Sequence, residues 1–210
     1  VPVVGLSETY TDNALLTATD EESELISSVN PGFSLRGKGN RLSVNVFYEM
    51  QALFHHRDTE ADEINHNLQG EAEAELVEDF LFLDLRSSVR QENVSNTAAS
   101  SSNNLIGTAN QTEVTSYSAS PRIQRRFADF GQLNARLQAG TVDSGSAGSA
   151  DHVRFVVDFD SGSRFVKLPW SVSYSQDRED DDSGAESDFE RFDLGASYPF
   201  NRKFALTFGA

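Results

Sequence analysis

Residues 179–190, with the sequence EDDDSGAESDFE, carry a dense set of carboxylates. The oxygen-bearing residues Glu179, Asp181, Ser183 and Glu190 follow in part the spacing of a calcium-binding loop, and a glycine stands at the position where such a loop turns sharply. The segment begins with Glu where calcium loops begin with Asp, and no helical pattern flanks it. Two interpretations follow: a weak calcium site, or a solvated acidic loop tip that binds divalent cations loosely and bridges to lipopolysaccharide phosphates. Neither implies a resident cofactor.

Histidines are the second group that could do chemistry. His55, His56, His66 and His152 all have carboxylates nearby in the predicted topology, and histidine beside a carboxylate is a common acid–base arrangement. However, no serine stands in a nucleophile-elbow context, and neither an H-E-x-x-H motif nor a glycine-rich phosphate loop occurs. The sequence therefore predicts a protein that is not an enzyme.

Charged residues at alternate positions form the third group. They are Glu49, Glu71, Glu73, Glu75, Asp84, Arg86, Arg90, Arg122, Arg136 and Arg154. On paired strands such residues share one face, where opposite charges can brace each other. They could line a pore that selects solutes, or form a salt-bridge ladder in a filled interior. With Arg126, the last three arginines could also attract an anionic sugar polymer, although neighbouring acids weaken that attraction.

The elements that position these residues alternate with a period of two. In Arg41 to His55 the even positions are apolar and the odd ones largely polar, which is typical of a β-strand with one apolar face and one polar face. The same pattern predicts about eleven strands, near Pro2–Tyr10, Glu24–Arg36, Arg41–His55, Ile64–Val77, Leu81–Glu92, Ser116–Gln124, Leu133–Ala139, Val153–Phe159, Val166–Tyr174, Arg191–Tyr198 and from Phe204 onward. We therefore predict an all-β antiparallel up-and-down meander in a single domain, residues 1–210.

Strand length, connection length and charge placement favour a transmembrane β-barrel, or an incomplete part of one. Most segments reach the roughly 9 to 11 residues that a tilted membrane-spanning strand needs. Short connections at 37–40, 78–79, 128–131, 161–163 and 201–203 alternate with longer polar ones at 56–63, 94–111, 143–151 and 177–187. Aromatic residues gather near the short turns, as in an interfacial girdle: Phe80, Phe82, Phe127, Phe130, Phe165, Tyr198, Phe200 and Phe204. A soluble β-sandwich with aromatic caps is the alternative.

Composition sets further bounds. The chain has 33 acidic and 17 basic residues, a formal net charge of −16, and no cysteine. Such a charge disfavours a nucleic-acid partner. No window approaches the roughly 18 consecutive apolar residues of a transmembrane helix, and the first residues lack the basic start and apolar core of a signal peptide.

Four stretches carry a resemblance to a known family: GLSETYTDNALL, NPGFSLRGKGNRLSVNVFYEMQALF, EAELVEDFLFLDLRSSVRQENVS and TEVTSYSASP. They resemble outer-membrane β-barrel proteins associated with the PEP-CTERM and exosortase system. The resemblance implies the outer membrane of a Gram-negative bacterium and a link to exopolysaccharide or protein sorting, but it supplies no functional residues. Because the chain stops within a strand at Phe208-Gly209-Ala210, and bacterial barrels use even strand counts, we expect a fragment of a longer barrel.

Three classes of function are therefore open. The first is a porin-like or export-associated channel in contact with membrane lipid, lipopolysaccharide and an extracellular polysaccharide or its export machinery. The second is a structural or docking barrel that does not conduct. The third is a soluble β-sandwich that binds carbohydrate.

Overall fold

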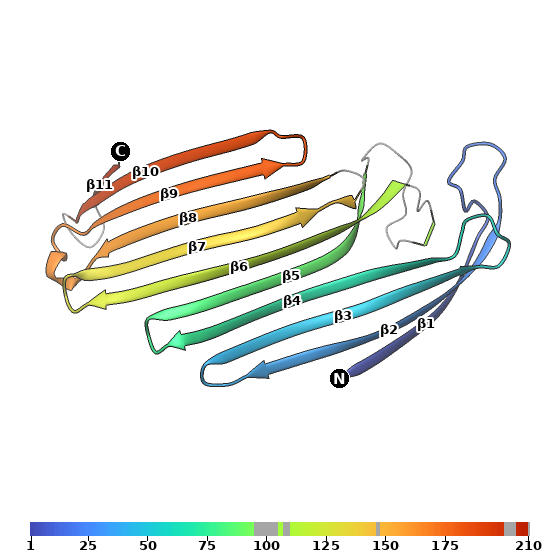
Figure 1. Ribbon diagram of the computed structural model, residues 1–210, viewed down its shortest axis with the longest axis horizontal. Coiled ribbons are helices and arrows are strands. Elements are labelled where there is room, and N and C mark those ends of the chain that lie inside the picture. The colour runs from blue at the N-terminus through green and yellow to red at the C-terminus, as the bar shows by residue number, and fades with distance from the viewer. Residues whose placement is uncertain (95–104, 107–109, 146–147, 200–204, 210) are drawn as a thin grey trace.

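The computed structural model describes residues 1–94, 105–106, 110–145, 148–199 and 205–209. The described part forms one antiparallel sheet whose eleven strands lie side by side in chain order (Figure 1). The strands are β1 (Pro2–Thr11), β2 (Glu24–Lys38), β3 (Leu42–His55), β4 (Glu63–Val77), β5 (Leu81–Asn93), β6 (Gln111–Phe127), β7 (Gly131–Asp143), β8 (Ser149–Ser161), β9 (Trp170–Asp181), β10 (Glu186–Pro199) and β11 (Ala205–Gly209). The predicted all-β up-and-down meander of eleven strands is confirmed.

The sheet is a single open layer over the described residues. Strand β1 pairs with β2 and β11 pairs with β10, and the two edge strands do not pair with each other. No second sheet packs on the first within the described part of the chain, so the stacked sheets of a β-sandwich are not observed. None of the described residues belongs to a helix that is long and apolar enough to cross a membrane.

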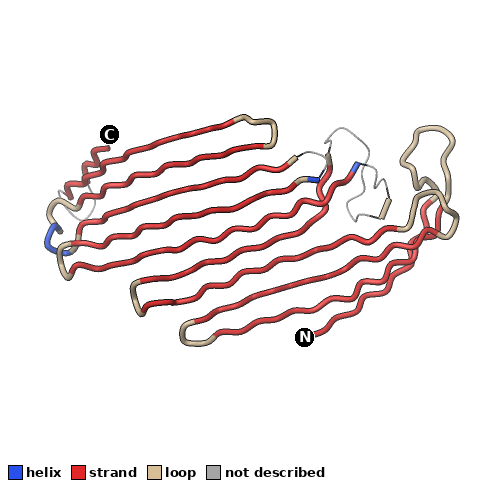
Figure 2. Tube along the Cα trace, in the orientation of Figure 1, coloured by secondary structure: helices blue, strands red, loops and turns tan. Residues whose placement is uncertain are grey.

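The connections differ at the two ends of the sheet (Figure 2). Tight turns at 39–41, 78–80 and 128–130 lie at one end, which we call the turn end. Asp79 and Ala128 adopt positive φ angles of 54° and 46°, as expected in short hairpin loops. Connections at 12–23, 56–62 and 182–185 lie at the opposite end, which we call the loop end.

Several strand boundaries differ from the sequence prediction. Val166 and Leu168 alternate as a strand would, but β9 begins only at Trp170, and a short 3-10 helix spans Ser163–Phe165. Pro169 lacks the N–H that a ladder needs, which explains the late start. The predicted loops at 143–151 and 177–187 are shorter, because backbone pairing continues through polar residues at the ends of β7 to β10. The predicted turn at 201–203, with Phe200 and Phe204, lies outside the described residues.

Strand register sorts the side chains onto two faces. The apolar face carries the even positions of β3 and their partners, and the polar face carries the odd positions and theirs. Large side chains on the apolar face are widely exposed: Leu85 is 44% exposed and Phe192 is 63% exposed. Among the described residues, the buried hydrophobic cluster comprises Ile26, Leu53 and Leu105, with Ile106 packed against it. An apolar face that is this exposed is costly in water and is expected to lie against another apolar surface or medium.

Candidate functional site

The polar face of the sheet carries every charged residue that the sequence singles out for a lumen. Register places Glu71 opposite Arg86, Glu73 opposite Asp84, and Arg122 opposite Arg136. The others are Glu49, Glu75, Arg90 and Arg154, at positions with the same facing. Backbone pairing alone therefore gathers on one surface residues that are more than 100 positions apart in the chain.

Asp84 is the centre of this surface. Its Oδ2 lies 3.5 Å from Nε of Arg122 and 3.4 Å from Nη2 of Arg136, so one carboxylate serves two arginines that face each other across strands. Glu73 lies 3.8 Å from Arg122 as well. The Arg122 guanidinium also sits 4.4 Å from the centroid of the Phe82 ring, a cation–π contact.

Phe82 therefore does not belong to an aromatic girdle. The sequence groups it with the aromatics near the short turns, but the structure places it on the polar face, opposite Glu75 on one side and Arg122 on the other. A register irregularity between Glu75 and Val77 precedes the β4–β5 turn. The facing of Phe82 does not depend on that irregularity, because Phe82 alternates in step with Asp84 and Arg86 along β5.

The remaining predicted charges are more loosely held. Arg154 approaches Asp177 at 3.5 Å, and both side chains are about half exposed. The Arg90 Nε donates to the Glu92 carboxylate two positions along the same strand, at 2.5 Å. Glu49 faces Gly32 and Asn67 across the neighbouring strands. These groups contribute little to stability, because water screens exposed ion pairs.

Two of the hollows along the polar face are lined by charged and amide side chains. One, of about 490 Å³, is lined by amide, hydroxyl and charged side chains that include Gln69, Arg86 and His152. The other, of about 400 Å³, lies between β6 and β8 and is lined by Arg122, Arg136, Arg154, Asn134, Gln138 and Asp158. Such a surface can hydrogen-bond water, sugars and small ions, and its arginines are interleaved with acids.

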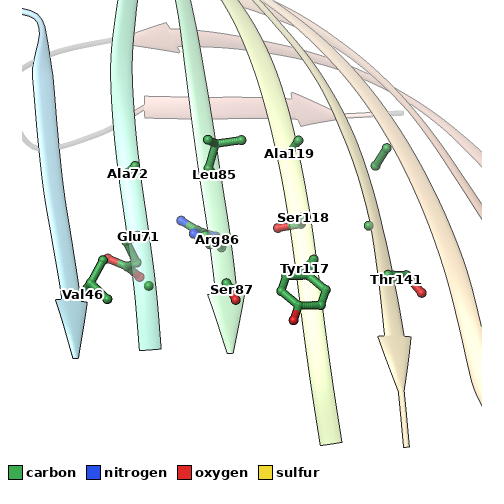
Figure 3. Close-up of a pocket in the computed structure, with 13 residues that line it drawn as sticks. Val46, Glu71, Ala72, Leu85, Arg86, Ser87, Tyr117, Ser118, Ala119 and Thr141 are labelled. Atoms are coloured by element: carbon green, nitrogen blue, oxygen red, sulfur yellow. The ribbon is translucent and has the colours of Figure 1, made fainter. Parts of the chain in front are cut away.

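A third hollow, of about 540 Å³, lies on the apolar face (Figure 3). Small residues such as Gly70, Ala72 and Ala119 form its floor, and Val46, Leu85 and Tyr117 are among the larger residues that line it. Its surface is overwhelmingly apolar. It suits hydrocarbon and offers no acid–base pair for catalysis.

A buried carboxylate, Glu24, fastens a loop over the polar face at the loop end. Its Oε1 accepts hydrogen bonds from the backbone N–H groups of Leu25 and Arg57, both at 2.8 Å. Its Oε2 accepts from the backbone N–H of Thr59 at 3.2 Å and from the Thr59 hydroxyl at 2.6 Å. Burial alone would raise the pKa of Glu24, but the bond from the Thr59 hydroxyl and the backbone bonds outweigh it and lower that pKa from 4.5 to about 2.

Ile26 and Leu53 lie nearby on the otherwise polar face, are nearly fully buried, and pack with Leu105 of the β5–β6 connection. His55 is buried here too, with Nε2 3.7 Å from Glu60, and its backbone N–H donates to Asp62 at 2.9 Å. Sequence reasoning missed this cluster. The available signal was the apolar Ile26 and Leu53 at positions whose facing should be polar.

The histidines are not assembled into one site. His55 and His152 lie on the polar face, whereas His66 lies on the apolar face, where its Nδ1 is 2.9 Å from the Tyr48 hydroxyl. His56 Nε2 is 2.7 Å from the Ser27 hydroxyl. All four histidines lie toward the loop end, but on different faces and strands, so the structure does not assemble them into one acid–base site.

The four residues of the calcium-loop pattern do not converge either. Glu179 and Asp181 lie on the polar facing of β9, and Glu190 pairs with Gln176 on the opposite facing. Asp181 instead closes its own turn, because its Oδ1 accepts from the Ser183 hydroxyl at 2.5 Å and from the backbone N–H groups of Ser183 and Ala185. Those bonds, the hydroxyl bond first, lower the pKa of Asp181. Across the described ranges, no group of three or more His, Asp or Glu side chains is placed to hold a metal ion.

Comparison with family models, curated proteins and solved structures gives no match to this chain.

The shared role of Asp84 predicts an unequal response to loss of charge. Asp84→Asn should lower the free energy of unfolding by about 1–3 kcal/mol, because it leaves two facing arginines without their common acid in a partly buried setting. Asp177→Asn, the matched control in a half-exposed pair, should cost less than about 1 kcal/mol. Chemical denaturation of both variants measures the difference, and equal losses would contradict a central role for Asp84.

The Glu24 contacts predict a pH-dependent loop. The folded-state pKa lies below the ordinary value, so the stabilisation is present above pH 4.5 and is lost as the pH falls toward about 2. Hydrogen-exchange protection factors of the Arg57 and Thr59 amides should fall over that window. Glu24→Gln should reduce these protection factors at neutral pH by the equivalent of about 1–3 kcal/mol, because the NH2 group of the glutamine side chain cannot accept hydrogen bonds from the two amides. Glu22→Gln, at an exposed neighbouring acid, is the control and should leave both amides protected.

Proposed function

We propose that this chain forms the wall of an outer-membrane β-barrel in a Gram-negative bacterium, with its apolar face against lipid and its polar face around an aqueous lumen. The observation that carries the proposal is the single sheet whose apolar face no other described segment covers. A soluble protein seldom leaves so large a continuous apolar surface in water, whereas a membrane barrel requires one.

The proposal also accounts for the placement of charge on the apolar face. Along β6 to β10 its charged positions, such as Glu113, Asp151, Arg178 and Asp188, lie toward the loop end, and Arg125 lies at the turn end. The middle of these strands carries residues such as Ala119, Leu137 and Phe155. A charged side chain at the bilayer midplane costs roughly 2–4 kcal/mol for Arg or Lys, so this distribution favours a lipid-facing band.

Closure of the sheet belongs to the proposal. The edges of β1 and β11 present unpaired backbone groups, which hydrocarbon cannot satisfy. In the membrane these edges must pair, either with each other or with further strands. The loop end then faces outward, with its acidic connections beside lipopolysaccharide, and the turn end faces the periplasm.

We assign the barrel to transport as a porin-like or export-associated channel. Hydroxyl, amide and charged groups cover the polar face, and the hollows between them suit hydrated or sugar-like solutes. The resemblance to barrels of the PEP-CTERM and exosortase system supports an extracellular polysaccharide or its export machinery as the partner.

A second candidate, a plugged barrel that serves as a scaffold, is favoured by one observation. Leu105, in the connection between β5 and β6, packs with Ile26 and Leu53 over the polar face at the loop end, and Ile106 packs against them. In a closed barrel this cluster would narrow the outer mouth of the lumen.

Two measurements on the reconstituted protein test the proposal. A folded barrel should migrate differently on a mild-detergent gel before and after heating, and a channel should give stepwise conductance in a planar bilayer. Heat-modifiable migration without conductance would support the plugged scaffold and contradict the channel. Monodisperse behaviour without detergent and unchanged migration would contradict the barrel itself.

A charge introduced on the apolar face tests the lipid contact directly. Leu85→Arg should lower the stability of the protein in vesicles by about 2–4 kcal/mol, because the guanidinium would enter hydrocarbon. Gln69→Arg, at an exposed position on the polar face, should have little effect. If both variants unfold at the same denaturant concentration as the parent, the apolar face does not meet lipid.

A further inference from the structure

Two neighbouring connections at the turn end are joined into one rigid unit. The backbone N–H of Gly162 donates to the carbonyl of Phe130 at 2.7 Å, and that of Arg164 donates to the carbonyl of Asp129 at 2.9 Å. A side chain at Gly162 would collide with the carbonyl group of Asp129, so only glycine fits this close approach. The backbone N–H of Trp170 donates to the Ser161 hydroxyl at 2.8 Å and closes the second connection.

Five aromatic rings pack around this unit. Phe159 stacks on Trp170 at 5.5 Å between centroids and contacts Phe127 at 6.3 Å and Phe130 at 5.9 Å. Phe165 meets Phe130 and Trp170 edge to face at 5.5 Å and 5.7 Å. Phe159 and Trp170 lie on the apolar face, so the cluster continues the lipid-facing band to its edge.

The segment 163–169 carries exposed apolar and basic side chains together. Val166 is 72% exposed, and Arg164 and Lys167 are exposed beside it. Neither basic group has an acidic partner within 4 Å in the described part of the chain, and Arg125 on the adjoining β6 lacks one too. The nearby acids are Asp129, which is exposed, and Asp160, which lies on the polar face.

The other described tight turns differ. At those connections Arg41 is paired with Glu78 at 2.8 Å, and Asp79 adds a further negative charge. Lys38 beside the β2–β3 turn also has no acidic partner among the described residues, but of the described turns only the joined ones combine unpaired basic side chains with a packed group of aromatic rings.

We propose that the joined turns form a binding surface for the phosphate headgroups of anionic phospholipids, and we name it the headgroup anchor. Its residues are Arg125, Phe130, Arg164, Phe165, Val166, Lys167 and Trp170. The rings and Val166 enter the interfacial layer, while the arginines and the lysine contact phosphate oxygens. Aromatic rings favour this layer, and each basic side chain near an anionic surface strengthens binding roughly fivefold. The inference rests on the membrane location proposed above.

Trp170 provides the test, because it is the only tryptophan in the protein. The protein is reconstituted into two sets of phosphatidylcholine vesicles. One set contains a small fraction of phosphatidylglycerol that is brominated near the headgroup, and the other contains the same fraction of phosphatidylcholine brominated at the same place. Brominated phosphatidylglycerol should quench Trp170 fluorescence several-fold more strongly at low salt, and high salt should remove the difference.

In the double variant Arg164→Gln/Lys167→Gln, both brominated lipids should quench Trp170 fluorescence equally. Arg57→Gln/Arg178→Gln, which removes the same charge at the loop end, should keep the preference of the parent. Equal quenching of the parent by both brominated lipids would overturn the headgroup anchor and leave the barrel intact. Absence of quenching by either lipid would instead contradict the membrane location.

Discussion

The structure depends on a sheet that pairs its backbone groups from strand to strand and whose apolar face is left without a covering layer by the rest of the described chain. Strands β2 to β10 each pair with two neighbours, so the fold needs no packed core to hold its backbone groups. What it lacks is a second surface against its apolar side. In water such a face would be costly, whereas in hydrocarbon it costs nothing, and paired backbone is the condition for entering hydrocarbon at all.

The polar face answers the opposite constraint. Charged side chains on this face must be stabilised by water or by ion pairs with each other, and both kinds of stabilisation are present. Arg122 and Asp84 are only 21% and 17% exposed at their side chains and share contacts with neighbours, whereas Arg154 and Asp177 are half exposed and remain hydrated. A surface that mixes fixed and free charges in this way is suited to contact with moving, hydrated solutes.

The sequence was sufficient to predict the strands and their order, because alternation of side chains is a local property that pairing preserves. It was less successful where a single residue overrides the pattern. Pro169 delays β9 despite the alternation at Val166 and Leu168. Phe82 was grouped with the aromatics near the turns by its place in the chain, although its alternation with Leu81 and Leu83 puts it on the side of Asp84. The Glu24 cluster was out of reach for another reason. Its donors, Arg57 and Thr59, come from a loop more than 30 positions away, and no period in the sequence records that contact.

The two ends of the sheet make different physical demands, and the residues divide accordingly. At the loop end, acidic connections lie around a small buried cluster, and a carboxylate with a lowered pKa holds the backbone of one loop. At the turn end, three connections are tight, and one of them, 128–130, is joined by backbone hydrogen bonds to the longer connection 162–169, beside a cluster of aromatic rings. A barrel whose ends were alike could insert in either direction. In the proposed barrel, acidic loops would resist passage through hydrocarbon far more than aromatic turns, so the same division of residues would set the direction of insertion.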